Sequence, residues 1–260
     1  MLPDQIDIPE SFAGAADVTG KRVVITGAGR GLGRLLAHAF SQGGARVALV
    51  ARTKTELKTV AGELPGPSLV VSGDVTDDEF NAVVARAAAA EWGGVDVWIC
   101  NAGISPILAG PMETDPAVWR EILDVNLTGA FLGARAAAGS MPNGGRLIFT
   151  GSVLGERPRE GLSAYGASKA GLVGLAKGLA LDLAPSGVTV NVVAPGWFDS
   201  PLAARWKASP ELAAGVLGHT AQRRWGASTD LAGAYLFLAS DSSAFVTGTV
   251  LNVDGGYLLV

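Results

Sequence analysis

Two side chains that can exchange protons, Tyr165 and Lys169, stand four positions apart in an otherwise small-residue stretch, SAYGASKAGL. On a helix this spacing places both groups on one face, one turn apart. A free phenol has a pKa near 10, and a cation within about 4–6 Å favours its ionised form. The pair therefore indicates a general acid–base device, on a surface whose small residues leave room for a ligand to come close. The alternative is an ordinary exposed pair worth a few tenths of a kcal/mol.

A second group of residues suits a phosphate. The segment TGAGRGLG (26–33) follows the apolar run RVVIT and leads into an expected helix. Free N–H groups and the dipole at a helix N-terminus favour an anion, and this is where doubly wound sheets bind a pyrophosphate. Gly27, Gly31 and Gly33 are expected to supply the tight turn, the close backbone approach and the helix–strand packing. The spacing is not G-x-G-x-x-G, so the general fingerprint alone does not identify it.

The end of the second expected strand indicates which dinucleotide is preferred. An acidic residue that would bind the ribose 2′-OH of NAD is missing there, and Ala51 and Arg52 take its place. Arg30 lies inside the glycine segment. Because guanidinium groups bind phosphate with two parallel donors, these arginines favour NADP, with NAD as the second possibility. The alternative is that Arg52 only caps a surface loop.

The elements that must position these groups alternate along the chain. Apolar runs typical of strands buried on both faces are found at 22–26, 46–50, 68–72, 95–100, 146–150, 188–194 and 249–253. Ala- and Leu-rich segments between them are expected to be helices, which predicts an α/β, Rossmann-like, doubly wound parallel sheet of seven strands with helices on both faces. We expect an N-terminal extension (1–18) and one domain (19–260), and we disfavour a division into two domains near residue 110.

Two helix starts carry sequence signals. Thr76 and Glu79 match a capping box, so the third expected helix should begin after Thr76. Asp115 followed by Pro116 places a capping residue before a proline at the first helical position.

Composition narrows the functional classes. The 260-residue chain is 48% hydrophobic, carries a net charge of −4 and has no block of Lys or Arg, so neither nucleic acid nor an acidic membrane is an expected partner. One cysteine, Cys100, forms no intrachain disulfide, and two histidines far apart give little basis for a metal site. No apolar run reaches the roughly 18 residues of a membrane span, and the start does not resemble a signal peptide. We expect a cytoplasmic protein.

Taken in order, the motifs resemble those of the short-chain dehydrogenase/reductase family, in its common form, from about residue 20 to the C-terminus. The motifs that carry this resemblance are TGAGRGLG, GDVTD, CNAG, VN (125–126), GS (151–152), YGASK, APGWFDSP and FVTGTVLNVDGG. The glycine spacing T-G-x-x-x-G-x-G is the one that the family uses. Tyr-x-x-x-Lys alone is weak evidence, but the whole series in family order is highly specific.

The resemblance implies a catalytic tetrad of Asn126, Ser152, Tyr165 and Lys169 in an NAD(P)-dependent oxidoreductase that acts on a secondary alcohol or ketone. Tyr165 would be the general acid and base, and Ser152 would donate a hydrogen bond to the substrate oxygen. Lys169 would hold the nicotinamide ribose, and Asn126 would hold a water molecule that relays the proton.

The resemblance also implies a set of cofactor-binding residues. Asp74 would contact the adenine, and the backbone of Phe198 would contact the nicotinamide carboxamide. The full set is Gly27, Arg30, Gly31, Leu32, Gly33, Arg52, Asp74, Val75, Asn101, Ala102, Gly103, Tyr165, Lys169, Pro195, Gly196, Phe198 and Ser200. The chain departs from the family pattern at Ser200, where Thr is usual, and at Cys100, which replaces an Asn and should behave as a small buried hydrophobe.

Substrate choice is expected to lie in the loop 199–226, which contains Leu202 and Trp206, and in the loop after Ser152. Arg157 and Arg159 in the latter could bind a substrate carboxylate or phosphate. We favour the alternative that they are solvated or paired with Glu156 and Glu160. The chain weakly resembles gluconate 5-dehydrogenase-like members, which favours sugar acids or polyols, but 3-oxoacyl-thioester reductases share nearly all the motifs.

Two expected helices, 115–141 and 162–185, are apolar on several faces. The family pairs them at a subunit interface, which implies a homotetramer, or failing that a dimer. Two other functional classes stay open at this point. One is a catalytically silent nucleotide-binding regulator on the same fold, and the other is a lyase or dehydratase that uses its cofactor only structurally.

Overall fold

The computed structural model describes residues 16–105, 108–141, 143–200 and 203–260. The fold is built around one parallel sheet. Its strands are β1 (Arg22–Thr26), β2 (Arg46–Ala51), β3 (Ser68–Ser72), β4 (Val97–Cys100), β5 (Gly145–Thr150), β6 (Val188–Pro195) and β7 (Val250–Val253). Their order in space is β3-β2-β1-β4-β5-β6-β7, and every neighbouring pair is parallel. This is a doubly wound, Rossmann-like sheet, as the alternation of elements predicts. The expected extension lies almost wholly outside the described residues.

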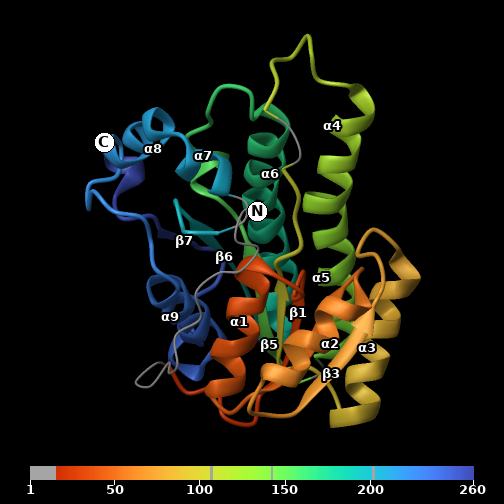
Figure 1. Cartoon of the computed structure of the whole chain (residues 1–260). Coiled ribbons are helices and arrows are strands. Elements are labelled where there is room, and N and C mark those ends of the chain that lie inside the picture. Colours follow the sequence, from red (N-terminus) through yellow and green to blue (C-terminus); the bar gives the residue numbers. More distant parts are fainter. Residues whose placement is uncertain (1–15, 106–107, 142, 201–202) are drawn as a thin grey trace.

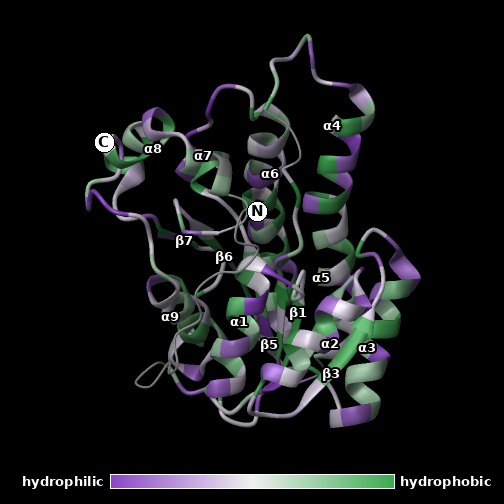
Figure 2. Ribbon diagram, in the orientation of Figure 1, coloured by the Kyte–Doolittle hydropathy of each residue, from purple (hydrophilic) through white to green (hydrophobic). Residues whose placement is uncertain are grey.

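Helices cover both faces of this sheet (Figure 1). They are α1 (Gly31–Gln42), α2 (Lys54–Glu63), α3 (Asp78–Trp92), α4 (Pro116–Leu123), α5 (Gly129–Ser140), α6 (Ser163–Leu183), α7 (Ala204–Ala208), α8 (Pro210–Gly218) and α9 (Ser228–Ala239). Side chains of α1, α2 and α9 pack in one hydrophobic core, and side chains of α3, α5 and α6 pack in another. The strands lie between the two cores, which explains why their sequences are continuously apolar. Figure 2 shows this contrast between the hydrophobic strands β1 and β3 and the mixed surfaces of α1 and α2.

The two helix-start signals have different outcomes. Asp115 caps α4 as expected, because its side chain accepts a hydrogen bond from Ala117 N at 2.7 Å and Pro116 takes the first helical position. The expectation for Thr76 is wrong. Asp77 caps α3 and accepts from Phe80 N at 3.3 Å, while Thr76 is engaged with the Asp74 carboxylate. Both residues are good caps, and the competing bond to Asp74 decides between them.

The expected long helix 115–141 contains a change of pitch. Between α4 and α5 the backbone forms a π-helical segment, Asp124–Thr128, before it returns to the α-helical form. Such wide turns are rare and turn side chains out of the regular helical register. This one directs Asn126 toward the carboxyl end of β4, where the chain continues into Gly103 and Ile104.

The expected loop 199–226 is partly helical, because it contains α7 and α8; Leu202 lies outside the described residues. No helix within the described part of the chain is long and apolar enough to cross a membrane.

Candidate active site

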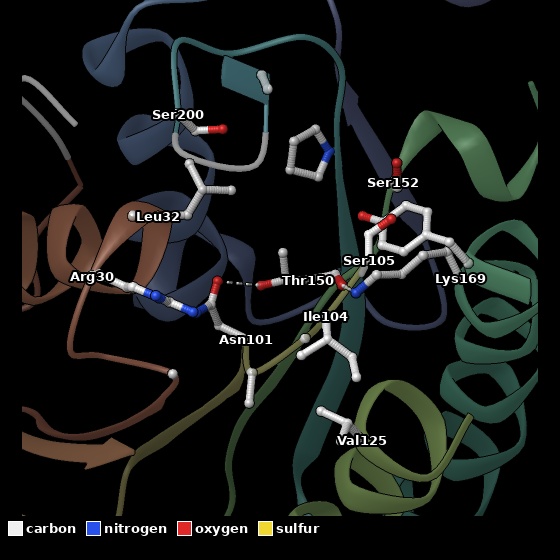
Figure 3. A pocket seen from close by; sticks show the side chains of 18 of the residues that line it. Arg30, Leu32, Asn101, Ile104, Ser105, Val125, Thr150, Ser152, Lys169 and Ser200 are labelled. Carbon is white, nitrogen blue, oxygen red and sulfur yellow. Dashed lines mark hydrogen bonds between the residues drawn. The ribbon is translucent and has the colours of Figure 1, made fainter. Parts of the chain in front are cut away.

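A cleft of about 690 Å³ lies at the carboxyl ends of the strands, where the strand order reverses between β1 and β4. Open parallel sheets bind their ligands at this position. Of the expected tetrad and cofactor-binding residues, only Asn126 is absent from its lining. Figure 3 shows the two ends: Arg30 and Leu32 lie at one, and Ser152 and Lys169 at the other.

The glycine segment connects β1 to α1 in a conformation that needs glycine. Gly27 and Gly31 have φ values of +69° and +56°, which other residues rarely adopt. A Cβ at Gly33 would lie 2.1 Å from Gly27 O, so the third glycine lets the helix start against the turn. Arg30, the N-cap of α1, makes no side-chain cap bond. The first turn of α1 thus offers N–H groups to an anion in the cleft.

Charged side chains gather at this nucleotide end. Arg30 and Arg52 are exposed and line the cleft, as does Asp74, whose carboxylate accepts hydrogen bonds from Thr76 N and Oγ1. Glu56, which sequence reasoning missed, lies against the glycine segment: a Cβ at Gly29 would lie 2.8 Å from Glu56 Oε2. Its position at the start of α2, four residues after Arg52, is the signal that could have found it.

These features together fit a dinucleotide. The glycine cradle would be filled by any Cβ at Gly33, the first turn of α1 is open, and the guanidinium groups of Arg30 and Arg52 line the same end of the cleft. No group of three or more His, Cys, Asp or Glu side chains in the described chain is arranged to hold a metal ion.

Tyr165 and Lys169 lie together on α6, as their spacing predicts. Lys169 Nζ is 5.6 Å from the centre of the Tyr165 ring and donates a hydrogen bond to Thr150 O at 2.8 Å. Both residues are buried, with exposed fractions of 9% for Tyr165 and 4% for Lys169. The ammonium is thus fixed at the end of β5, beside the phenol.

The electrostatics differ from the expectation. Burial raises the pKa of Tyr165, against the lowering effect of a hydrogen bond from Ser152. Burial also lowers the pKa of Lys169 to about 8. Removing both side chains from water favours their neutral forms in the protein without a bound dinucleotide.

Asn126 is buried beside the cleft. Its Oδ1 accepts from Ile104 N at 2.8 Å, and its Nδ2 donates to Ile104 O and Ser168 Oγ at 3.0 Å each. A Cβ at Gly103 would lie 3.3 Å from Asn126 Oδ1 and 3.4 Å from Lys169 Nζ, so the three residues converge. Ser152 follows β5 and lines the cleft on the same side as Tyr165.

The small residues between Tyr165 and Lys169 were expected to leave room for ligands. They do not, because none of them lines the cleft. A Cβ at Gly166 would lie 3.0 Å from Leu154 O, so this glycine admits the turn after Ser152. Ser168 is fully buried and bonds Asn126 and Tyr165 O. The small size of Gly166 and Ser168 thus serves packing around the helix, whereas Ala167 is exposed.

A buried network that the sequence did not reveal supports the site from behind. Thr150 Oγ1 donates to Asn101 Oδ1 at 3.3 Å, the dashed line in Figure 3, and lies 2.8 Å from the hydroxyl of Tyr235 on α9. Asn101 Nδ2 in turn donates to Thr26 O at 2.9 Å. Cys100, just before Asn101, is buried, and its burial raises the pKa of the thiol.

The arginines after Ser152 neither stand free in solvent nor pair with Glu156 and Glu160 in the described structure. Arg157 donates to backbone oxygens of Tyr257 and Val260, so it binds the C-terminal segment. Arg159 lies over Trp206 and Trp197, with its Cζ 4.8 Å and 5.6 Å from the ring centres. Neither arginine lines the cleft.

Comparison with known proteins agrees with this geometry. Residues 27–258 match the family model described as enoyl-(acyl carrier protein) reductase. The chain is 39% identical over 253 residues to 3β-hydroxysteroid dehydrogenase 1 of Eggerthella lenta, covering 94% of this chain and 95% of that one. It is 36% identical over 244 residues to the 3-oxoacyl-(acyl-carrier-protein) reductase FabG of Salmonella typhimurium, covering 93% and 98%.

A solved structure is similarly close. It is a proposed NAD(P)-dependent gluconate 5-dehydrogenase from Beutenbergia cavernae with bound NADP at low occupancy, and it superposes with a TM-score of 0.89 at 38% identity. The match covers 95% of this chain and all of that one. The chain belongs to the short-chain dehydrogenase/reductase family.

Proposed function

We propose that this protein is an NAD(P)-dependent oxidoreductase that interconverts a secondary alcohol and its ketone. The observation that carries the proposal is a single cleft that joins an open helix N-terminus in a glycine turn to a buried Tyr165–Lys169 pair with Ser152 beside it. The chemistry of the family and of its relatives supports the same reaction class.

In this proposal Tyr165 and Ser152 act on the substrate oxygen, and Lys169 and Asn126 support them. The bound nicotinamide supplies or accepts the hydride. Tyr165 donates its phenolic proton to the carbonyl oxygen in reduction and takes a proton from the hydroxyl in oxidation. Ser152 donates a hydrogen bond to the same oxygen. Lys169 holds its charge beside the phenol, and Asn126 positions the Ile104 segment through two backbone hydrogen bonds.

NADP is the preferred cofactor in this proposal. Arg30 and Arg52 bind the 2′-phosphate, and the exposed position of both side chains at the adenosine end supports this role. The NADP bound to the Beutenbergia structure supports it as well. The remaining cofactor contacts follow the lining of the cleft, from Gly27 to Ser200.

A spectrophotometric assay tests the reaction. Purified protein with NADPH is presented with a panel of ketones, and oxidation of the cofactor is followed together with product. We expect turnover that Tyr165→Phe lowers by at least about 1,000-fold while NADPH binding persists. Binding without turnover in either protein would instead indicate a silent regulator. Product without net cofactor oxidation would indicate a lyase or dehydratase.

The assembly that fits this proposal is a homotetramer in the cytoplasm. Phe131 on α5 is 41% exposed and Leu181 on α6 is 79% exposed, so apolar surface lies on the helices that the family pairs between subunits. Light scattering coupled to size exclusion measures the mass, and a dimer or monomer would contradict the tetramer. The lone buried thiol of Cys100 suits a reducing compartment.

A further inference from the structure

The half of the cleft next to Tyr165 and Ser152 is mainly apolar, and Ser105 adds one further hydroxyl beside these two residues (Figure 3). Its walls are formed by Leu108, Leu154, Leu162, Trp197, Ala203 and Trp206. Among the described residues that line the cleft, the charged ones are Lys169 and, at the nucleotide end, Arg30, Arg52, Glu56 and Asp74. The Lys169 ammonium donates to Thr150 O. The described walls of the substrate half therefore offer no other cationic side chain that could bind a substrate carboxylate or phosphate.

The tryptophan side of this half is stiff. The rings of Trp197 and Trp206 meet edge to face, with centres 5.0 Å apart and planes at 61°. Trp225 and Tyr257 pack on Trp197 from further out, with ring centres at 6.1 Å and 6.2 Å. Such contacts hold aromatic rings in one arrangement and add about 0.5–1.5 kcal/mol per pair to their burial.

Arg159 supports this wall from behind. Its guanidinium lies over both tryptophan rings, as a cation does over aromatic faces, yet it does not reach the cleft. Arg159 Nη1 and Trp197 Nε1 are both buried without a hydrogen-bond partner in the described structure. Because these two donors are buried inside the wall, neither is offered to a substrate, which meets the aromatic surface of Trp197 and Trp206 in the cleft.

We propose that the substrate is an uncharged ketone or secondary alcohol with a bulky ring body, alicyclic or aryl, that packs against Trp206 and Trp197. The inference rests on the proposed oxidoreductase function and names its substrate class. A sugar acid or polyol would leave a carboxylate or several hydroxyls without partners, which is costly in an apolar site. A flexible acyl chain would lose more conformational entropy on a rigid wall than a ring does.

The test measures kcat/KM with NADPH for cyclohexanone, trans-1-decalone, 5-ketogluconate and acetoacetyl-N-acetylcysteamine. Each buried methylene is worth about fourfold in affinity, so decalone should exceed cyclohexanone by at least about tenfold. Both cyclic ketones should have a higher kcat/KM than the sugar acid and the thioester.

Trp206→Ala connects this preference to the wall. It should lower kcat/KM for decalone by at least about tenfold and for cyclohexanone by no more than about threefold, because the smaller ring leaves most of the wall uncovered. Trp206→Leu should restore part of the decalone activity. Trp92→Ala, at the far end of α3, is the matched control and should leave the ratio of the two ketones unchanged. Thermal unfolding of each variant verifies the fold.

The outcomes separate the two proposals. Faster turnover of 5-ketogluconate or of the thioester than of decalone leaves the oxidoreductase assignment standing and overturns the substrate class. The substrate class is also overturned, and the oxidoreductase assignment kept, if kcat/KM is higher for 4-oxocyclohexanecarboxylate than for 4-methylcyclohexanone and Arg159→Gln removes that preference. Turnover of none of the probes by a protein that binds NADPH overturns the proposed function, and the substrate class with it.

Discussion

The hydroxyl groups of Tyr235 and Thr150 lie 2.8 Å apart, inside the protein and directly behind the candidate active site. Tyr235 is fully buried on α9, and Thr150 ends β5. Because Thr150 Oγ1 donates to Asn101 Oδ1, which can only accept, the proton between the two hydroxyls belongs to Tyr235. The Thr150 carbonyl accepts the Lys169 ammonium, so one residue connects α9 to the cofactor side and to the proton-transfer side of the cleft.

This contact predicts a measurable coupling. Tyr235→Phe should lower the free energy of unfolding by about 0.5–1.5 kcal/mol, the net value of one hydrogen bond. Thr150→Val should cost about 1–3 kcal/mol or more, because it leaves the buried Tyr235 hydroxyl without an acceptor. In the double variant the costs should fall short of their sum by at least about 0.5 kcal/mol. Urea unfolding of the four proteins checks this, and additive losses would contradict it.

The buried ammonium of Lys169 predicts a pH-dependent stability. Its pKa is about 8 in the folded protein, below the value near 10.4 of an exposed lysine. Between these values the unfolded chain holds more protons, so stability should rise from pH 8 to pH 10. Lys169→Met lacks this contribution. Its free energy of unfolding relative to that of the wild type should therefore fall by about 2–3 kcal/mol over that interval.

Denaturant unfolding of wild type and Lys169→Met at pH 7, 8, 9 and 10, without dinucleotide, measures this. Tyr165, whose pKa burial raises in the folded protein, is present in both proteins, so the comparison isolates the contribution of Lys169. Equal pH slopes in the two proteins would show that the ammonium is solvated rather than buried.

The position of Arg52 in the cleft predicts a preference for NADPH over NADH. A charge-assisted bond to a 2′-phosphate is worth about 1.5–3 kcal/mol, so Arg52→Ala should weaken NADPH binding about 10- to 100-fold and leave NADH binding unchanged. Arg46→Ala is the control, because Arg46 is also exposed on β2 but begins the strand, at the opposite edge of the sheet. Calorimetric titration with both dinucleotides gives the ratio. A wild type that prefers NADH would refute the assignment.

The close contact between Gly33 and Gly27 predicts that the glycine turn accepts no side chain at position 33. Gly33→Ala places a methyl group 2.1 Å from Gly27 O, and the backbone must move apart at a cost of about 1–3 kcal/mol. NADPH binding should fall with stability. Gly62→Ala, on the exposed side of α2 with nothing within 4 Å of the new methyl, should instead stabilise by up to about 1 kcal/mol. An unchanged melting temperature for Gly33→Ala would contradict the model of a closed turn.

Much of the architecture can be read from the chain itself. Strands buried on both faces must be continuously apolar, and therefore the seven runs identified in the sequence correspond to the seven strands, with ends that differ by no more than two residues. The glycine turn, the Tyr165–Lys169 spacing and the cleft-lining residues carry local signals, because each depends on backbone conformation or helical periodicity over a few residues. Their chemical roles stay predictions that the assays above test.

Tertiary structure alone decided what depends on distant partners. Local sequence could not show that Asp74 holds Thr76 and leaves the cap to Asp77, or that burial would raise the Tyr165 pKa despite its lysine neighbour. Nor could it show that Tyr235 reaches Thr150 across 85 positions, or that Arg159 packs on tryptophans rather than on glutamates. Desolvation and packing depend on which groups surround a side chain in space, and those groups are brought together only when the sheet and its helices assemble.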